Sequence, residues 1–511
     1  MKKAVIVFVF LIFSFKLFSQ AGNISLYNEY YNDYLRYLDT TGKVHTAIRP
    51  LIFDEQLMKM AEQLPLFSTF SEKDKRWKVV NNSRLTWETN PIITAGVNLS
   101  DENFGNRTTV GIGLGQKVTV VKNISLFADF QMVNGGFDSL HTAFMDSSRI
   151  VPGMGSFFSA SGSRRAFLKS RGGISWKTAS WFHLFAGYDK VFLGDGYRSL
   201  FLSDNSIPFW QVRATVVTRH ISYIMLYSFL NDDDSDIPGI SYRSKFASTH
   251  YLNWNIGKRL QLNVFESVVW RGEDSLSKRG FDVNYISPIV FFRPVEFNLG
   301  SPDNMLLGMG GRFRLFKHLH LYGQLVLDEF KLSEVKAQTG WWANKFGMQA
   351  GLRAIFTMKE NRVLLIQAEA NGVRPFTFTH WNSLENYGNN LQPLAHPLGA
   401  NFFEWITTGK YLVKRMTYEV NIKYAEWGTD SAGVNMGHNI YQSYRDSRKD
   451  YGNTWLQGEK HSRLMAEAKV SRIMNLQWNM KIELGLRYNC YTCPGLKVNE
   501  VLVTGGIVTC F

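Results

Sequence analysis

The sequence predicts an all-β fold: a closed antiparallel transmembrane β-barrel of about eighteen strands, preceded by a short N-terminal helical segment. Three observations predict it. The chain begins with an export signal, long runs alternate apolar and polar residues, and the connections between these runs alternate between short and long. Together they favour an exported membrane protein over a soluble enzyme.

The first twenty residues have the pattern of a secretory signal peptide. Lys2 and Lys3 form a basic start, an apolar run extends from Val5 to Phe18, and small residues near Ala21 suit cleavage. The run is too short and wrongly flanked for a retained spanning helix. No later stretch approaches the roughly 18 consecutive apolar residues that a spanning helix needs. We therefore expect residues 1–20 to be removed on export.

Alternation with period two is the main signal in the rest of the chain. It places every second side chain on one face of a strand. The runs of about 10 to 15 residues exceed the usual strand length of five or six. Lipid offers no partner for backbone N–H and C=O groups, so a sheet can span a membrane only when it closes. The clearest alternating sets are Leu319, Leu321, Gly323, Leu325, Leu327; Met416, Tyr418, Val420, Ile422, Tyr424; and Leu476, Trp478, Met480, Ile482, Leu484, Leu486, Tyr488.

Tryptophans recur at the predicted strand ends, as in the aromatic girdles of outer-membrane barrels. These are Trp87, Trp181, Trp270 and Trp427. The chain also ends on an aromatic residue, Phe511, after a strand-like run, which resembles the terminal signal of assembled outer-membrane barrels.

Connection lengths order the strands, because periplasmic turns of such barrels are short and external loops are long. Short turns fall near 122–123, 179–180, 219–220, 258–259, 317–318, 360–361, 413–414 and 475. Long loops fall at 134–165, 192–208, 231–243, 271–303, 330–342, 372–401 and 428–460. The predicted strands are 80–99, 107–121, 124–133, 166–178, 181–191, 209–219, 221–230, 244–257, 260–270, 304–316, 318–329, 343–358, 361–371, 402–413, 415–427, 461–473, 475–489 and 499–511.

The chain is expected to have three parts: the signal peptide (1–20), a segment 21–76 and the barrel 77–511. Apolar residues in the middle part have helical spacing. They are Leu26, Tyr30, Tyr31, Tyr34, Leu35, Leu38, then Phe53, Leu57, Met60 and Leu64. We expect a small helical periplasmic or plug element there.

The composition is basic, with 57 Lys and Arg against 43 Asp and Glu and a formal net charge of +14. Such a charge suits acidic partners, here membrane lipid or acidic polysaccharide, although an ordinary solvated surface explains it equally well. Nucleic acid is a poor partner for an exported chain. Cys490 and Cys493 form one C-x-x-C without a second ligand pair, so zinc is not expected; a local loop disulfide and no role at all stay open.

The unusual segments fall in the predicted external loops, at 194–205, 291–304, 374–380 and 396–401. Residues of these types could fold into a wide lumen and line it, or could bind sugars, whose rings stack on aromatic faces and whose hydroxyls bond polar groups. The candidate ligand-binding or lumen-lining residues are Asp195, Tyr197, Arg198, Asp204, Asn205, Arg293, Glu296, Asp303, Asn304, Arg374, His380 and His396.

Enzymatic and metal sites are not expected. His380, His396 and His438 have Asp and Ser nearby, but their spacing matches no nucleophile motif. The acidic run 231–236 lacks the ordered ligand spacing of a calcium loop. We therefore expect a protein without catalytic residues, metal or cofactor.

Five segments resemble the capsule-assembly Wzi-type outer-membrane proteins, and most of all the branch found in Bacteroidetes that is often labelled gliding-motility RemB-like. They are GDGYRSLFLSDN (194–205), GSPDNMLLGM (300–309), LYGQLVLDEF (321–330), WWANKFGMQAGLR (341–353) and LAHPLGANF (394–402). The resemblance covers most of residues 80–511 and implies an eighteen-stranded barrel with a periplasmic helical part. It implies binding or organising of surface polysaccharide. A scaffold for gliding motility or protein secretion, with other envelope proteins as partners, is the alternative, and a passive pore is a third hypothesis.

Overall fold

The structure is a computed structural model of the 511-residue chain. It describes residues 23–24, 44–52, 77–100, 106–121, 123–232, 243–272, 280, 282–287, 303–359, 362–431, 433–445 and 448–510. The predicted signal peptide and the two predicted helical runs of residues 26–38 and 53–64 lie outside the described residues.

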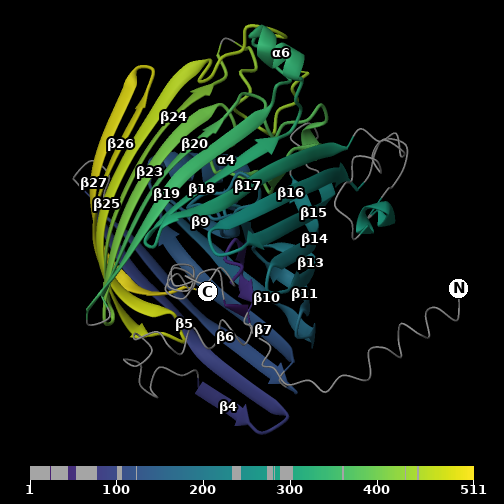
Figure 1. The fold of residues 1–511 in the computed structure, drawn as a ribbon. Coiled ribbons are helices and arrows are strands. Elements are labelled where there is room, and N and C mark those ends of the chain that lie inside the picture. Colours follow the sequence, from purple (N-terminus) through teal and green to yellow (C-terminus); the bar gives the residue numbers. More distant parts are fainter. Residues whose placement is uncertain are drawn as a thin grey trace, which may run out of the picture.

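Eighteen long strands of the described chain form one closed antiparallel barrel, as the sequence predicted (Figure 1). Each strand pairs with the next along the wall, and β27 pairs with β5 to close it. The strands are β5 (Leu85–Ser100), β6 (Arg107–Val120), β7 (Ile124–Gly136), β10 (Arg164–Ala179), β11 (Phe182–Asp189), β13 (Phe209–Val217), β14 (Ile221–Asp232), β15 (Arg243–Ile256), β16 (Leu260–Arg271), β17 (Asn304–Phe316), β18 (Leu319–Leu327), β19 (Phe346–Met358), β20 (Arg362–Val373), β23 (Phe402–Val413), β24 (Met416–Thr429), β25 (Glu459–Asn475), β26 (Met480–Cys493) and β27 (Leu496–Thr509).

Short strands, helices and turns lie outside this wall, in the connections between its strands and before β5. A hairpin strand, β4 (Trp77–Asn81), pairs with the start of β5. The loop after β7 carries α4 (Ser139–Ser148), β8 (Ile150–Val151) and β9 (Gly155–Ser161), and the loop after β18 carries α6 (Leu332–Ala337). The η3 turn (Val283–Ile286) and η5 turn (Ser383–Glu385), with the β21–β22 pair (Gly388–Asn389 and Gln392–Pro393), lie in other loops. All of these loops except the β4 hairpin occupy the end of the barrel that was predicted to be external.

One prediction near the C-terminus is wrong, and one of two alternatives left open there, a local disulfide, is not observed. Residues 476–479 form a turn, so the alternating run that begins at Leu476 crosses a turn before β26 starts at Met480. Cys490 and Cys493 lie on β26, which is joined to β27 by a tight turn, and neither forms a disulfide. Three residues apart on a strand, the two side chains point to opposite faces.

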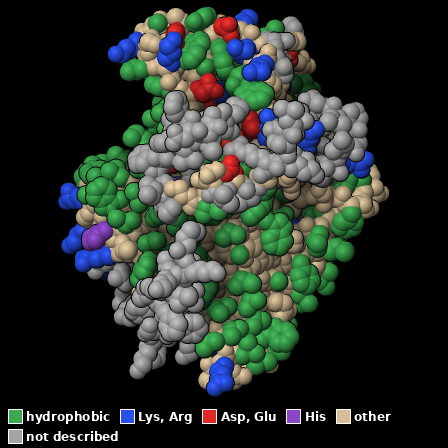
Figure 2. All heavy atoms as spheres, turned by 90° about the vertical axis from the view of Figure 1, so that its right-hand side faces the viewer, with side chains coloured by type: hydrophobic (Ala, Val, Ile, Leu, Met, Phe, Trp, Pro, Cys, Tyr) green, Lys and Arg blue, Asp and Glu red, His purple; other side chains and the backbone are tan. Residues whose placement is uncertain are grey.

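The outer face of the wall is apolar. Leu321, Leu325 and Leu327 point outward as predicted, while the alternate residues Tyr322 and Gln324 are buried in the lumen. On β26, Leu484 exposes 63% of its surface. Figure 2 shows hydrophobic side chains gathered over the wall, with charged residues concentrated at the end that carries the loops. An apolar band of this kind is what a membrane-spanning barrel presents to lipid.

No helix in the described part of the chain is long and apolar enough to cross a membrane.

The predicted tryptophan girdle is correct in part. Trp87 and Trp181 are exposed on the outer face. Trp270 is fully buried instead, because its ring packs on Tyr285 at 4.8 Å and its Nε1 donates to the Gly280 carbonyl. Trp427 is half-buried and stacks on His461 at 5.6 Å. Lipid therefore contacts only some of the tryptophans at strand ends.

The barrel encloses a hydrophobic core. Residues of the two loops 190–208 and 374–401 pack there against inward-facing side chains of the wall. Ile224 and Leu226 of β14 face inward and are fully buried, although Met225 and Tyr227 on the same strand face lipid. The loop residues in this core include Val191, Leu193, Leu200, Phe201, Leu202, Phe378, Tyr387, Leu394 and Ala395.

A piece of the N-terminal segment also lies inside the barrel. Strand β2 (Ile48–Arg49) pairs with β12 (Phe192–Leu193), and β1 (Asn23–Ile24) pairs with β3 (Leu51–Ile52). His45 lies 2.6 Å from the side chain of Asn253 on β15. The described part of residues 21–76 thus contains short extended pieces, and residues 44–52 help to fill the lumen (Figure 1).

Candidate functional site

The loop between β11 and β13, residues 190–208, is hereafter the plug loop. Its backbone is held by a buried carboxylate on β20: the N–H groups of Tyr197 and Arg198 donate to Glu369 at 2.6 and 3.0 Å. The hydroxyl of Tyr322 donates to the same carboxylate at 2.9 Å. Glu369 therefore fixes this loop in the lumen.

The plug loop is joined to the second long loop through Glu404 of β23. Arg198 donates from Nε and Nη2 to the two oxygens of Glu404 at 3.2 and 3.0 Å. His396 Nε2 lies 2.7 Å from the same carboxylate, and the Leu398 N–H donates to His396 Nδ1. Burial lowers the pKa of His396 although Glu404 opposes it, so the ring is neutral at pH 7 and donates from Nε2. This cluster locks two loops to the wall.

Two further candidates of the plug loop contact the wall directly. The Tyr197 hydroxyl accepts from Lys423 Nζ at 2.7 Å. The Asp195 carboxylate accepts from Gln261 Nε2 at 2.8 Å and lies 3.6 Å from Arg312 Nη1. Both side chains line the filled lumen.

The end of the plug loop is tied to its neighbours. Lys190 Nζ donates to the backbone carbonyl of Asp204 at 2.9 Å. Asn205 Nδ2 donates to the Pro393 carbonyl at 3.1 Å. These bonds tie the end of the plug loop to its own start and to the second long loop.

The candidates before β17 and after β20 also hold loops together. The Tyr285 hydroxyl donates to Asp303 at 2.6 Å. Asn304 Nδ2 donates to the backbone carbonyl of Glu385 at 2.8 Å, and His380 Nδ1 lies 2.8 Å from the Glu385 carboxylate.

Arg374 lies with its guanidinium 5.6 Å from the Phe346 ring. Arg293 and Glu296 lie outside the described residues. The structure thus places ten of the twelve candidates. At seven of them the contacts described above attach a loop to another loop or to the wall, and those of Asp204, Asp303 and His380 lie within a single loop. These contacts agree with the lumen-lining role that was expected from the sequence as one of two alternatives.

A different group of side chains gathers at the external end. Its members come from three loops, and we call it the external aromatic cluster. The Trp342 ring lies 4.5 Å from Tyr444 and 6.1 Å from Phe376. Trp341 and Trp381 complete the set; Trp341, Trp381 and Tyr444 are half-buried and so present part of their rings at the surface.

Guanidinium groups accompany these rings. Arg448 lies 4.2 Å from the Trp342 ring centroid. Arg445, which is exposed, lies 4.7 Å from Trp381, and Arg271 lies 5.6 Å from the same ring. Cation–π contacts of this kind are favourable. Arg448 pairs with Asp450 at 3.1 Å and Arg271 lies 3.5 Å from Glu385, so the positive charge of this surface comes mainly from the exposed Arg445. Apolar ring area and a guanidinium group are properties that suit sugar rings with acidic groups.

Sequence reasoning missed this cluster. Trp341 and Trp342 stood inside a motif used only for the family resemblance, and the run from Tyr444 to Lys449 was treated as part of a long loop. The signal that could have found it is the density of aromatic and basic residues in two predicted external loops.

The described residues contain no group of three or more His, Cys, Asp and Glu side chains that could hold a metal ion. His380 and His396 contact carboxylates within the loop network described above, and His141 contacts Asp138 at the start of α4.

Comparison with known proteins gives a fold. No protein-family model and no curated protein sequence matches the chain. Among solved structures, Wzi of Escherichia coli, described as a carbohydrate-binding β-barrel involved in group 1 capsule assembly, matches with a TM-score of 0.57 and 12% identity over 96% of this chain and 100% of Wzi.

More distant matches include OprD of Pseudomonas aeruginosa, with a TM-score of 0.42 and 10% identity over 85% of this chain and 97% of OprD. OccAB4 of Acinetobacter baumannii matches with a TM-score of 0.41 and 8% identity over 86% of this chain and all of that chain. The chain has the barrel fold of Wzi.

Proposed function

We propose that this protein is an integral outer-membrane barrel, exported by a cleaved signal peptide, that binds or organises surface polysaccharide at the cell surface without catalysing a reaction. The observation that carries the proposal is the external aromatic cluster, where half-buried rings lie beside guanidinium groups. Such a surface suits an acidic polysaccharide, since rings stack on sugar faces while Arg pairs with carboxylates. The fold shared with a carbohydrate-binding barrel supports it.

The contents of the lumen support a passive pore less well than polysaccharide binding. A pore needs a continuous polar path, and from β14 to β18 the plug loop closes that side of the lumen with an apolar core. Phe201, for example, stacks on Phe265 of β16 with ring centroids 4.8 Å apart.

The test is binding of the purified full-length protein to alginate, an acidic polysaccharide, and to dextran, a neutral one. We expect alginate to bind and its affinity to fall by about tenfold in a Trp381→Leu/Arg445→Gln double variant, the loss of roughly 1.4 kcal/mol. Arg219→Gln is the matched control, because Arg219 is exposed in a turn at the opposite, periplasmic end. Failure of the protein to bind alginate, dextran and the polysaccharide isolated from its own cells would refute the proposal.

A scaffold for gliding motility or secretion is the second candidate, and the observation behind it is the resemblance to the RemB-like branch. It predicts that envelope proteins co-purify with the barrel and that a deletion strain spreads poorly. Capsule staining together with surface spreading of a deletion strain separates the two functions.

A further inference from the structure

The two ends of the barrel differ in the sign of their charge. At the external end acidic and basic residues lie together, as in the pairs of Lys331 with Glu334 and Arg448 with Asp450. In the short turns at the periplasmic end, every charged residue that the structure describes, histidine aside, is Lys or Arg. We call these residues the basic rim: Arg84, Arg219, Lys258, Arg259, Lys317, Lys359, Lys414 and Arg415.

The side chains of the basic rim are accessible from outside the protein. All except Arg415 are exposed, and none of the exposed ones forms an ion pair with a carboxylate of the described residues. Arg415 donates to the Met474 carbonyl at 3.4 Å. Two further charged residues of these turns, Lys122 and Glu360, lie outside the described part of the chain and are opposite in sign. The rim therefore has a net positive charge, which attracts anions.

Two more arginines bring positive charge to the lipid-facing side of this end. Arg472 of β25 is exposed, and it alternates with Val470 and Met474, which are exposed on the outer face. Arg362 is the first residue of β20, is also exposed, and lies on the same face as Ile366. The apolar stem of an arginine can cover the edge of an apolar band while its guanidinium reaches the level of the head groups. These two positions place cations beside lipid and not only beside water.

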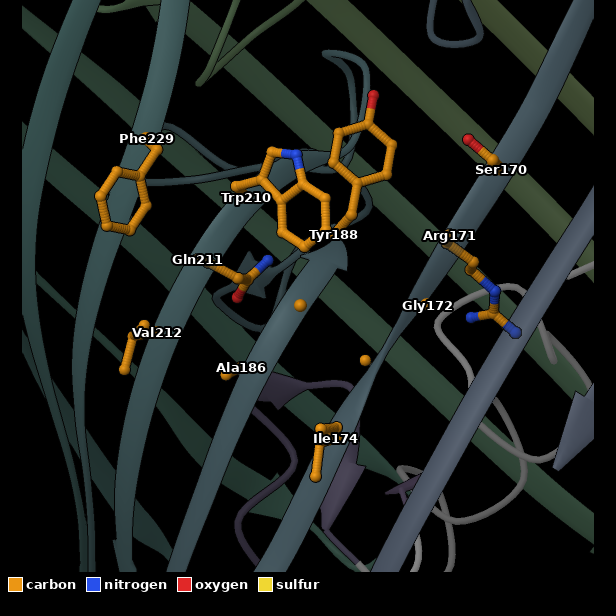
Figure 3. A pocket seen from close by; sticks show the side chains of 12 residues that line it. Ser170, Arg171, Gly172, Ile174, Ala186, Tyr188, Trp210, Gln211, Val212 and Phe229 are labelled. Carbon is orange, nitrogen blue, oxygen red and sulfur yellow. The ribbon is translucent and has the colours of Figure 1, made fainter. Parts of the chain in front are cut away.

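The wall above the rim offers nothing that selects a head group. On the outer face of β10 to β14 it has a groove of about 810 Å³, lined by residues such as Ile174, Val212 and Phe229 (Figure 3). Arg171 is the charged residue of the lining, and it pairs with Asp129 at 2.6 Å. An apolar surface of this kind accepts the acyl chains of any lipid. Selection among lipids therefore depends on the charged rim.

The spread of the basic rim indicates what kind of anion it meets. Its residues occupy five successive turns, from the turn between β13 and β14 to the turn between β23 and β24, which join ten of the eighteen strands. A protein partner would meet one compact patch. Lipid head groups surround a membrane barrel on all sides, so a charge that follows the circumference suits them better.

We infer that the basic rim binds the anionic head groups of phospholipids in the periplasmic leaflet and so enriches these lipids around the barrel. Each Lys or Arg near a membrane surface strengthens the attraction to anionic lipid, and the effect falls off within a Debye length. The inference rests on the membrane location and orientation in the proposed function. It does not depend on polysaccharide binding, which takes place at the opposite end.

The test measures lipid selectivity by electron paramagnetic resonance of spin-labelled lipids around the full-length protein in phosphatidylcholine bilayers. The fraction of each spin-labelled lipid that is immobilised at the protein surface gives its relative association constant. For the wild type we expect phosphatidylglycerol to associate about threefold more strongly than phosphatidylcholine. Equal association of the two lipids with the wild type would overturn the inference.

A pair of matched variants assigns the preference to the rim. Lys258→Gln/Lys317→Gln/Lys359→Gln removes one charge from each of three periplasmic turns and should lower the preference by about twofold. The control is Lys336→Gln/Lys460→Gln/Lys497→Gln, which removes the same charge from exposed lysines at the external end and should leave the preference unchanged. An equal preference in the two triple variants would contradict the role of the rim.

Two further measurements keep the inference testable without relying on the variants alone. Raising the salt to 1 M should remove most of the wild-type preference, because the Debye length is then about 3 Å; a preference that salt leaves unchanged would overturn the inference. Isolated peptidoglycan should not sediment with the purified protein, and sedimentation that is lost only in the rim variant would assign the rim to a cell-wall polymer instead. Alginate binding should be the same in both triple variants, so failure here and failure of the proposed function are distinguishable.

Discussion

Two parts of the barrel wall face the lumen with different chemistry. From β14 to β18, inward-facing residues such as Leu226, Phe265 and Val326 are fully buried against the two long loops. From β24 to β26, the inward face carries ions: Lys469 lies 3.9 Å from Glu419 and 3.8 Å from Glu483, and its side chain is still 21% exposed. The described loops therefore cover the inner face from β14 to β18 more fully than this ionic part of β24 to β26, which lies near the short-turn end; the plug loop meets β24 nearer the other end, at Lys423.

The contrast has a physical cause. A charge that faces water keeps its hydration and needs only weak pairing, whereas a charge buried under a loop needs full compensation. The wall beneath the loops therefore uses apolar side chains, with a few carboxylates such as Glu369 and Glu404 that are each saturated with donors. Four predictions test this difference between the two parts of the wall, and they are given from the largest expected effect to the smallest.

Removing the plug loop should open the covered side. Asp189 and Phe209 are register partners of β11 and β13, so a two-residue turn can replace residues 190–208. We expect large ion conductance in planar bilayers from this variant and little from the wild type. Equal conductance in both proteins would show that the plug loop is not what closes the lumen.

Within the covered side, Phe201→Ala should destabilise the protein by about 3–5 kcal/mol, because it removes a fully buried ring from a packed core. Phe130→Ala is the control, since Phe130 lies on the lipid face of β7 and exposes 45% of its surface. The measurement is the unfolding temperature of each variant in detergent micelles. A loss in the control as large as that in Phe201→Ala would contradict the loop-centred core.

Stability should depend on pH through Asp328, which lies at the external end of β18. Burial raises the pKa of Asp328 from 3.8 to about 6, although Lys345 at 3.1 Å opposes the rise. The folded state therefore binds this proton more tightly than the unfolded state. Stability from this group is greatest below pH 4 and falls as the pH rises to about 6.

The check is a comparison of wild type with Asp328→Asn in chemical unfolding across this pH window. The variant should lose the dependence; an identical slope in both proteins would assign the effect to other groups.

On the ionic side, Lys469→Gln should change stability by less than about 1 kcal/mol, because partly exposed pairs contribute little. A loss of several kcal/mol, measured in the same unfolding assay, would indicate that this face is covered as fully as the opposite one.

Much of the wall could be predicted from the sequence, because a strand exposed to lipid must show apolar residues at period two and a turn must follow it. The alternation at Leu319 to Leu327 and the short turns therefore located strands to within a few residues over most of the chain. β14 is different: Ile224 and Leu226 are apolar on the inner face as well, so its sequence carries no sign of what covers it. What covers the inner face of β14 depends on contacts with a loop that is distant in the sequence.

The site was harder to predict for the same reason. Asp195, Arg198 and His396 were chosen as polar loop residues, and the partners that define their roles, Gln261, Glu369 and Glu404, lie on distant strands. The external aromatic cluster is assembled from three loops, so no single segment displays it. Residue type alone does not separate a loop anchor from a residue that meets a ligand.

The most direct test of the account is the partition of surface polysaccharide between intact cells and their medium. Strains would carry the wild-type protein, the Trp381→Leu/Arg445→Gln variant or the Arg219→Gln control at equal levels in the outer membrane. The account predicts that polysaccharide moves from the cells into the medium only in the double variant. An unchanged partition in that strain and in a deletion strain would contradict it.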